Sequence, residues 1–304
     1  MPLRRSADLA LLVTVLIWGL NFPIIKVALE PMPPYVVNAL RFVASAVVLG
    51  ALHAWQVRGQ RGAFWAPFRE HPWTVVGLGL LGYVGYQWLF IVGVDATSAG
   101  SAALLIASAP MWTAMIAQAT GMERLSLGAW GGLGLSLAGT ALVILAGTGA
   151  VAFSEDTLSG NLLMLGAAVA WAAYTVFSRP VLGTGISATG LAFFGIVVSL
   201  PILWALGLSD LDQVDWSGVD GTVWSALLFS GALSTGVAYW FWNAAVQRVG
   251  PSQTAIYSNL VPVVALASGA LLLGEAVTLF QLLGGALILG GLFLMRRARR
   301  PVAA

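Results

Sequence analysis

One stretch of this chain occurs twice: residues 90–125 and residues 242–277 are variants of one another, offset by 152 residues. In each copy a proline precedes a glutamate by 13 residues, as Pro110 and Glu123 and as Pro262 and Glu275. The same relation extends to the first helix expected in each half, where an aromatic residue precedes a basic one by eight residues: Trp18 and Lys26, then Trp171 and Arg179. A period of this length repeats a group of elements, so the chain is predicted to contain two related units.

Composition indicates where these units fold. Charged residues make up 9% of the chain and hydrophobic residues 59%, whereas soluble domains carry about 25% charged residues. The 36 glycines and 13 tryptophans are typical of helical membrane proteins. We therefore expect an all-α polytopic membrane protein. Because there is no cysteine and neither histidine has a partner at ligand spacing, we expect no metal and no cofactor.

Ten apolar runs are long enough to cross a bilayer. The first continues to about Leu29, too far for a signal peptide. The expected helices cover roughly residues 9–29, 34–55, 73–93, 96–119, 127–147, 160–179, 188–208, 222–245, 252–273 and 278–295.

Basic residues fall on one side of these ten helices. That side holds 12 of the 14 lysines and arginines, whereas the loops of the opposite side hold acidic residues only. The positive-inside rule then places both termini in the cytoplasm. The basic set is Arg4, Arg5, Arg58, Arg61, Arg69, Arg124, Arg179, Arg248, Arg296, Arg297, Arg299 and Arg300.

Five helices in each half have a geometric consequence. The second unit enters the membrane from the opposite face, so residues 1–150 and residues 155–300 are predicted to form two inverted five-helix repeats. Such an architecture supplies outward-open and inward-open states around a site at the middle of the membrane, which makes a transporter working by alternating access the leading hypothesis.

Polar and aromatic residues share faces in matched helices of the two halves. Spacings of three and four residues place each set on one side of its helix, and amides in the membrane need partners inside the bundle. The alternative is that the amides join helices and the rings fill space. The substrate-binding candidates on these faces are Trp18, Asn21, Tyr83, Tyr86, Gln87, Trp171, Tyr174, Tyr239, Trp242, Asn243, Tyr257 and Asn259.

Two basic residues lie within or near the expected spans. Arg41 lies seven residues into its helix, on the order of 10 Å along the axis, and Lys26 lies near the outer end of the first helix. Each either binds a substrate carboxylate or extends to the membrane surface. Pro23, Pro110 and Pro262 are candidate hinges or gates, with simple kinks as the alternative.

What is missing also narrows the mechanism. The acidic residues near the spans all lie at helix ends, and a pump for cationic drugs needs a carboxylate buried in the membrane. A neutral or zwitterionic substrate therefore fits better. No Walker A pattern occurs, so ATP is not expected to drive this chain directly.

The motifs WGLNFPIIK, NALRFVASAVVL, ATSAGSAALLIASAP with GMERLS, and SNLVPVVALASGALLLGE resemble the drug/metabolite transporter superfamily, specifically its EamA-type ten-helix members. The resemblance covers nearly the whole chain and looks closest to the YddG-like amino-acid exporters. It implies that helices one to four and six to nine surround the pathway and that helices five and ten stand at the periphery. Gly128, Gly132, Gly284 and Gly285 then suggest contacts for the two peripheral helices.

The resulting expectation is a secondary transporter, not an enzyme, which exports neutral amino acids or similar metabolites across the bacterial inner membrane. Its partners are the small-molecule substrate and the lipid bilayer, with no nucleic acid, and it is expected to be a monomer or a weak homodimer. The alternatives are a multidrug exporter of neutral aromatic compounds and, from another class, a membrane enzyme acting on lipid-linked substrates.

Overall fold

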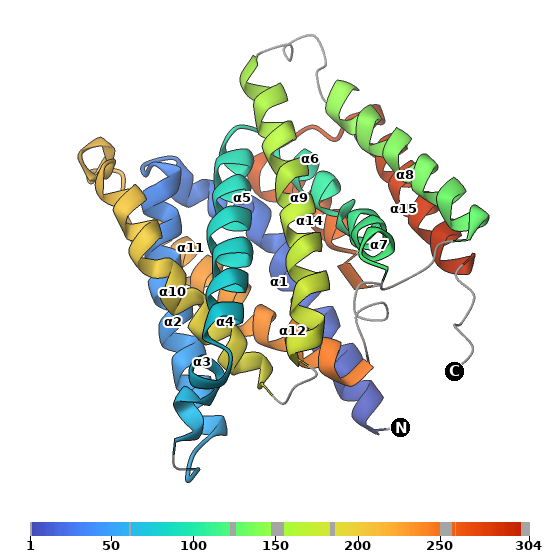
Figure 1. Cartoon of the computed structure of the whole chain (residues 1–304). Coiled ribbons are helices and arrows are strands. Elements are labelled where there is room, and N and C mark those ends of the chain that lie inside the picture. The colour runs from blue at the N-terminus through green and yellow to red at the C-terminus, as the bar shows by residue number, and fades with distance from the viewer. Residues whose placement is uncertain are drawn as a thin grey trace.

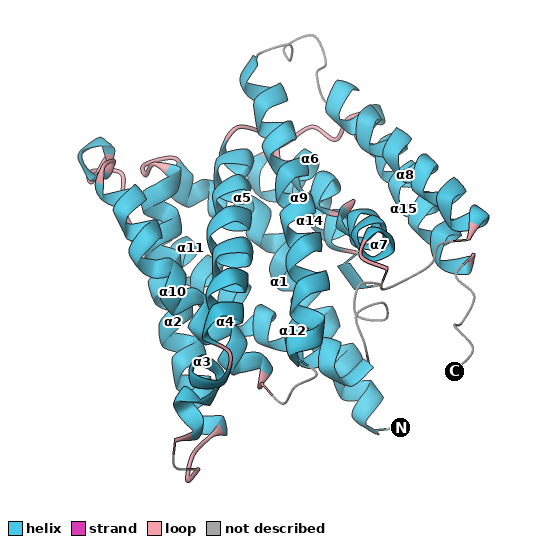
Figure 2. Ribbon diagram, in the orientation of Figure 1, coloured by secondary structure: helices cyan, strands magenta, loops and turns pink. Residues whose placement is uncertain are grey.

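The computed structural model describes residues 2–60, 62–121, 126–146, 155–182, 186–249, 257–258 and 260–298. Helices account for most of these residues, and none of them forms a strand (Figure 2). This part of the chain is therefore all-α, as expected. Its α-helices are α1 (Pro2–Leu29), α2 (Pro34–Gln56), α3 (Ala66–Glu70), α4 (Pro72–Gly79), α5 (Tyr86–Asp95), α6 (Ala99–Ile106), α7 (Ala109–Ala119), α8 (Leu127–Ala146), α9 (Glu155–Leu182), α10 (Ala188–Leu208), α11 (Gly221–Leu228), α12 (Ala238–Val249), α14 (Val261–Leu273) and α15 (Leu279–Arg297).

Seven helical runs are long and apolar enough to cross a membrane, which identifies a multi-pass membrane protein. They correspond to seven of the ten expected spans. The other three expected spans fall on shorter apolar helices, Leu127–Val143, Val261–Leu273 and Leu279–Met295. The seven runs are Asp8–Leu29, Pro34–Gln56, Pro72–Asp95, Ala99–Ala119, Leu158–Leu182, Ala188–Leu208 and Gly221–Ala245.

Three of these runs are not continuous α-helices. The π-helical segment η2 (Leu80–Gly85) joins α4 to α5, and the π-helical segment η4 (Phe229–Val237) joins α11 to α12. Shifted back by the repeat offset, η4 overlaps η2. The run Ala99–Ala119 is interrupted at residues 107–108, between α6 and α7. Pro110 lies in the first turn of α7, where its missing N–H leaves no hydrogen bond of the helix unmade.

The two halves pack in a matched way (Figure 1). The first long helix, α1, packs against α12 and α14 of the second half, and its counterpart α9 packs against α5, α6 and α7 of the first half. Two further pairs, α2 with α10 and α8 with α15, each join a helix to its own counterpart. Each half therefore completes its packing on the other half.

The pair formed by α8 and α15 stands at one edge of the bundle (Figure 1). Glycines let the two backbones approach closely: a Cβ atom added at Gly132 would lie 2.5 Å from the carbonyl oxygen of Gly291, and one at Gly139 would lie 2.6 Å from that of Gly284. The expected contact between the fifth and tenth helices is confirmed. Of the other two glycines expected there, Gly128 faces Ala298, the residue after α15, whereas Gly285 faces Leu104 of α6.

Candidate functional site

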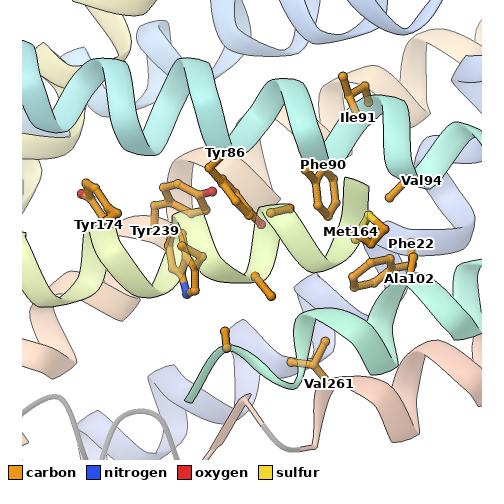
Figure 3. Close-up of a cluster of buried hydrophobic side chains, with 14 of the residues drawn as sticks. Phe22, Tyr86, Phe90, Ile91, Val94, Ala102, Met164, Tyr174, Tyr239 and Val261 are labelled. Carbon is orange, nitrogen blue, oxygen red and sulfur yellow. The ribbon is translucent and has the colours of Figure 1, made fainter. Parts of the chain in front are cut away.

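Seven of the predicted residues form one buried ring cluster, called here the aromatic cluster. Trp171 of α9 lies at its centre, with ring centroids 6.0 Å from Trp18, 5.1 Å from Tyr86 and 5.3 Å from Tyr239. Figure 3 shows Tyr86, Tyr174 and Tyr239 close to the ribbons of α5 and α9. Rings from both halves meet in this cluster. The aromatic residues that have matched spacings in the two halves of the sequence therefore lie together in the fold. The members are Trp18, Tyr83, Tyr86, Trp171, Tyr174, Tyr239 and Trp242.

Hydrogen bonds tie the polar ends of these rings together. The side-chain amide of Gln87 donates to the hydroxyl of Tyr239 at 2.8 Å, and the hydroxyls of Tyr83 and Tyr174 share a bond of 3.2 Å. The side chain of Asn243 also hydrogen-bonds to Tyr174. The first two of these bonds join the two halves of the chain, so polar contacts as well as rings hold the halves against one another.

Two buried amide oxygens near the rings have no hydrogen-bond partner among the described residues: Oε1 of Gln87 and Oδ1 of Asn21. Both side chains are almost fully buried. An acceptor buried without a partner is costly, and most such groups are satisfied by protein or by water. These two oxygens can accept hydrogen bonds from a bound molecule.

The π-helical segment η4 lies beside this cluster and is held by side chains of the first half. The indole N–H of Trp18 donates to the carbonyl oxygen of Ser234 at 3.0 Å, and the hydroxyl of Ser45 donates to that of Gly231 at 2.8 Å. A π-helical turn changes the backbone hydrogen-bond register, so carbonyl oxygens can take side-chain donors. The indole of Trp18 thus has both a packing and a hydrogen-bonding role.

Arg41 of α2 reaches the same region. Its Nη2 donates to the hydroxyl of Thr235 in η4 at 2.9 Å, and its guanidinium carbon lies 5.7 Å from the ring centroid of Phe90. Phe90 in turn contacts Tyr86 of the aromatic cluster at 5.7 Å. The guanidinium therefore does not extend to the membrane surface in this structure. It lies among the aromatic rings.

Lys26 lies elsewhere, at the end of α1, where it interacts with the carboxylates of Glu275 and Asp95. Glu275 also accepts hydrogen bonds from the backbone N–H groups of Ala99 and Gly100, at 3.0 and 3.3 Å, and so caps the first turn of α6. The glutamate of the second repeat copy thus joins the end of α14 to α6 of the first half. Its counterpart Glu123 lies outside the described residues.

The other predicted residues are not members of the aromatic cluster. Tyr257 donates from its hydroxyl to the carboxylate of Asp8, at 2.8 Å, and Asn259 lies outside the described residues. Pro23 lies inside α1, whereas Pro110 and Pro262 lie in the first turns of α7 and α14. A role as a substrate ligand stays a prediction for Tyr257 and Asn259, and a role as a hinge stays a prediction for the three prolines.

Sequence reasoning missed the residues that position these side chains. Thr235 anchors Arg41, and Ser45 holds η4, but both lie in runs of small residues that suggest only close packing. Glycines also shape the site, because the Tyr174 ring packs on Gly82 and the Tyr83 ring packs on Gly195. The sequence signal for these residues was that GALSTGV in the second half matches the glycine-rich stretch at the equivalent positions of the first half.

The chain matches the EamA-like transporter family over residues 5–145 and again over residues 158–297. It is 31% identical to a "Probable amino-acid metabolite efflux pump" of Salmonella typhimurium, over 96% of this chain and 94% of that protein. A protein of the same name in Escherichia coli is also 31% identical, over 96% of this chain and 94% of that protein. A "Probable terminal-alkyne amino-acid exporter" of Streptantibioticus cattleyicolor is 28% identical, over 95% and 92% of the two chains.

One solved crystal structure shares the fold, with a TM-score of 0.68, 22% identity, and coverage of 98% of this chain and 99% of the other. The family match spans both halves of the chain, and the relatives match it over nearly its full length. The family and the names of the relatives indicate a transporter rather than an enzyme. This chain belongs to the EamA-like transporter family.

Proposed function

We propose that this protein is a secondary transporter that exports amino acids or similar small metabolites by alternating access. The observation that carries the proposal is the aromatic cluster, in which rings and amides from both halves meet at one buried place. The names of the relatives, amino-acid efflux pumps and an amino-acid exporter, support the substrate class.

The matched packing of the two halves supports this mechanism. Residues 1–150 and residues 155–300 act as two inverted five-helix repeats, and the second state exchanges the roles of equivalent helices. Because α1 with α12 and α14 mirrors α9 with α5, α6 and α7, either set can open while the other stays closed. The substrate separates rings that are in contact in this structure. Trp171 contacts five other rings of the cluster, so its surroundings change when the substrate binds.

The topology that this mechanism needs has ten membrane spans and both termini in the cytoplasm of a bacterial cell, with the protein in the inner membrane. The chain has no cysteine, so single cysteines can be labelled without background. An impermeant maleimide should label Asp212→Cys in intact cells and Gln60→Cys only after permeabilisation. Labelling in the reverse order would refute this orientation.

Transport is tested by counterflow in liposomes. Vesicles preloaded with unlabelled phenylalanine or leucine should accumulate the labelled amino acid above the level of empty vesicles. Trp171→Ala should lower this flux about 10-fold or more, because it removes the central ring contact. The matched control Trp216→Ala, at an exposed loop tryptophan, should transport at the wild-type rate. Wild-type protein without flux for a broad amino-acid panel would refute the function.

The runner-up is a multidrug exporter of neutral aromatic compounds, because the same rings suit a flat apolar molecule. Neutral dyes and amino acids can be compared in one assay by competition. Dyes that are carried while amino acids neither move nor compete would favour the runner-up.

A further inference from the structure

Arg41 is the only lysine, arginine, aspartate or glutamate that is buried among the side chains that the structure describes, with 2% of its surface exposed. Desolvating a cation is expensive unless an opposite charge or a full set of hydrogen bonds compensates. No carboxylate of the described residues pairs with it. Its neighbours are the ring of Phe90 and, in the aromatic cluster, Tyr86 and Tyr239.

The hydrogen-bonding capacity of this guanidinium is largely unused. A guanidinium carries five N–H groups, and among the described residues only Nη2 has a hydrogen-bond partner, the hydroxyl of Thr235. Nε and Nη1, which together carry three of those N–H groups, have none among the described residues. The bond to Thr235 holds the side chain against η4, so the unused N–H groups have fixed positions.

An acceptor lies in the same neighbourhood. Gln87 donates through Nε2 to the Tyr239 hydroxyl, which also interacts electrostatically with Arg41. This bond leaves the Oε1 atom of Gln87 buried and without a partner. Unused donors on a cation and an unused amide acceptor, both adjoining Tyr239, are complementary to the carboxylate and the ammonium group of one small molecule.

We propose that Arg41 binds the carboxylate of the transported molecule and that Gln87 accepts a hydrogen bond from its ammonium group, so that the substrates are zwitterionic α-amino acids. This inference rests on the proposed transport function. The side chain of the substrate then lies among the rings of the aromatic cluster, which set size and shape but not charge. A planar guanidinium with two adjacent donors suits a carboxylate better than an amine or an amide.

The repeat explains why there is one such subsite. Phe194 of α10 follows Arg41 by 153 residues, the same separation as between Trp18 and Trp171, and so occupies the matching position. It packs among His53, Phe64 and Trp65 rather than in the aromatic cluster. The cluster therefore binds a carboxylate from the side of α2 only. The two halves differ in chemistry at this matched position.

The test compares three molecules as inhibitors of labelled phenylalanine counterflow: unlabelled phenylalanine, phenylalaninamide, which lacks the carboxylate, and 3-phenylpropionate, which lacks the ammonium. In the wild type, the amide should inhibit about 10- to 100-fold less well than phenylalanine, the range for loss of a charge-assisted hydrogen bond. The propionate should fall between them. Equal inhibition by phenylalanine and the amide would overturn the inference without any variant.

Two variants assign the discrimination to Arg41. In Arg41→Gln the ratio between the amide and phenylalanine should fall to near one, whereas Thr235→Val, which removes the anchoring hydroxyl but keeps the cation, should retain a ratio well above one. A wild-type ratio in Arg41→Gln would overturn the inference. If Arg41→Gln fails to fold, the comparison of the three inhibitors on the wild-type protein still tests the inference. Absent counterflow in the wild type refutes the transport function instead, so the two failures are distinguishable.

Discussion

The close contact between α8 and α15 predicts a large effect from a very small change, Gly132→Ala. The added Cβ atom would lie 2.5 Å from the carbonyl oxygen of Gly291 and 2.5 Å from the backbone nitrogen of Met295. Contacts shorter than 3.4 Å are already tighter than almost all real Cβ contacts. Both atoms belong to the backbone, so no side chain can rotate away, and the two helices must separate by roughly 1 Å.

The magnitude follows from two opposing terms. Forcing a methyl group into a packed contact costs about 1–3 kcal/mol, and replacing glycine by alanine inside a helix returns about 0.5–1 kcal/mol. The net destabilisation should be on the order of 1–2 kcal/mol. Gly134→Ala, on the same helix, is the matched control, because its Cβ atom would meet nothing within 4 Å. It should be neutral or stabilising.

The assay is thermal unfolding followed by the fluorescence of the 13 tryptophans. Gly132→Ala should melt several degrees below Gly134→Ala, while both keep the wild-type KM for transport, since no described residue of α8 or α15 belongs to the aromatic cluster. If Gly132→Ala melted at or above Gly134→Ala, the close backbone contact would be refuted.

Three further predictions concern other contacts. Glu275→Ala should lower the free energy of unfolding by about 1–3 kcal/mol, because two backbone N–H groups of α6 lose their acceptor. Glu275→Gln keeps an acceptor oxygen and should lose less in the same melting assay. Equal losses in the two variants would contradict the capping role. Gly82→Ala should reduce amino-acid counterflow several-fold because it displaces the ring of Tyr174, whereas Gly77→Ala, which meets nothing within 4 Å, should transport normally. Hydrogen bonds from the backbone N–H of Val223 and from Thr222 hold the pKa of Asp220 below its ordinary value. The ionised form is therefore stabilised by folding, so the melting temperature of the wild type relative to Asp220→Asn should be highest above the ordinary aspartate range and should decrease as pH falls through the lowered pKa; a pH-independent difference would contradict this.

Hydrophobicity and spacing predicted much of the fold. The expected spans 34–55 and 188–208 agree with α2, Pro34–Gln56, and α10, Ala188–Leu208, to within a residue. Apolar run length cannot reveal backbone register, so the π-helical segments η2 and η4 were missed. In η4, carbonyl oxygens accept hydrogen bonds from side chains that lie more than 180 residues away in sequence.

The candidate site was predictable where the repeat could be compared with itself. Trp18 and Trp171 occupy matched positions of the repeat, Tyr86 and Tyr239 lie on matched helices, and the structure places all four in one cluster. Residues without a counterpart were harder to place. Arg41 could have extended along its helix to the membrane surface, and only the position of Thr235 shows that it turns inward. The aromatic character of Tyr257 could not reveal its bond to Asp8, which lies 249 residues away.

The packing of each half on the other also constrains how the protein is made. The first helix, α1, finds its partners in α12 and α14, and its tryptophan bonds to a carbonyl 216 residues further along the chain. Contacts this distant in sequence form late and slowly. During synthesis the helices of the first half therefore lack these partners, and their polar faces stay uncovered, until the helices of the second half have been inserted. A truncated chain that ends after the first half never acquires these partners, which makes it a natural substrate for membrane quality control.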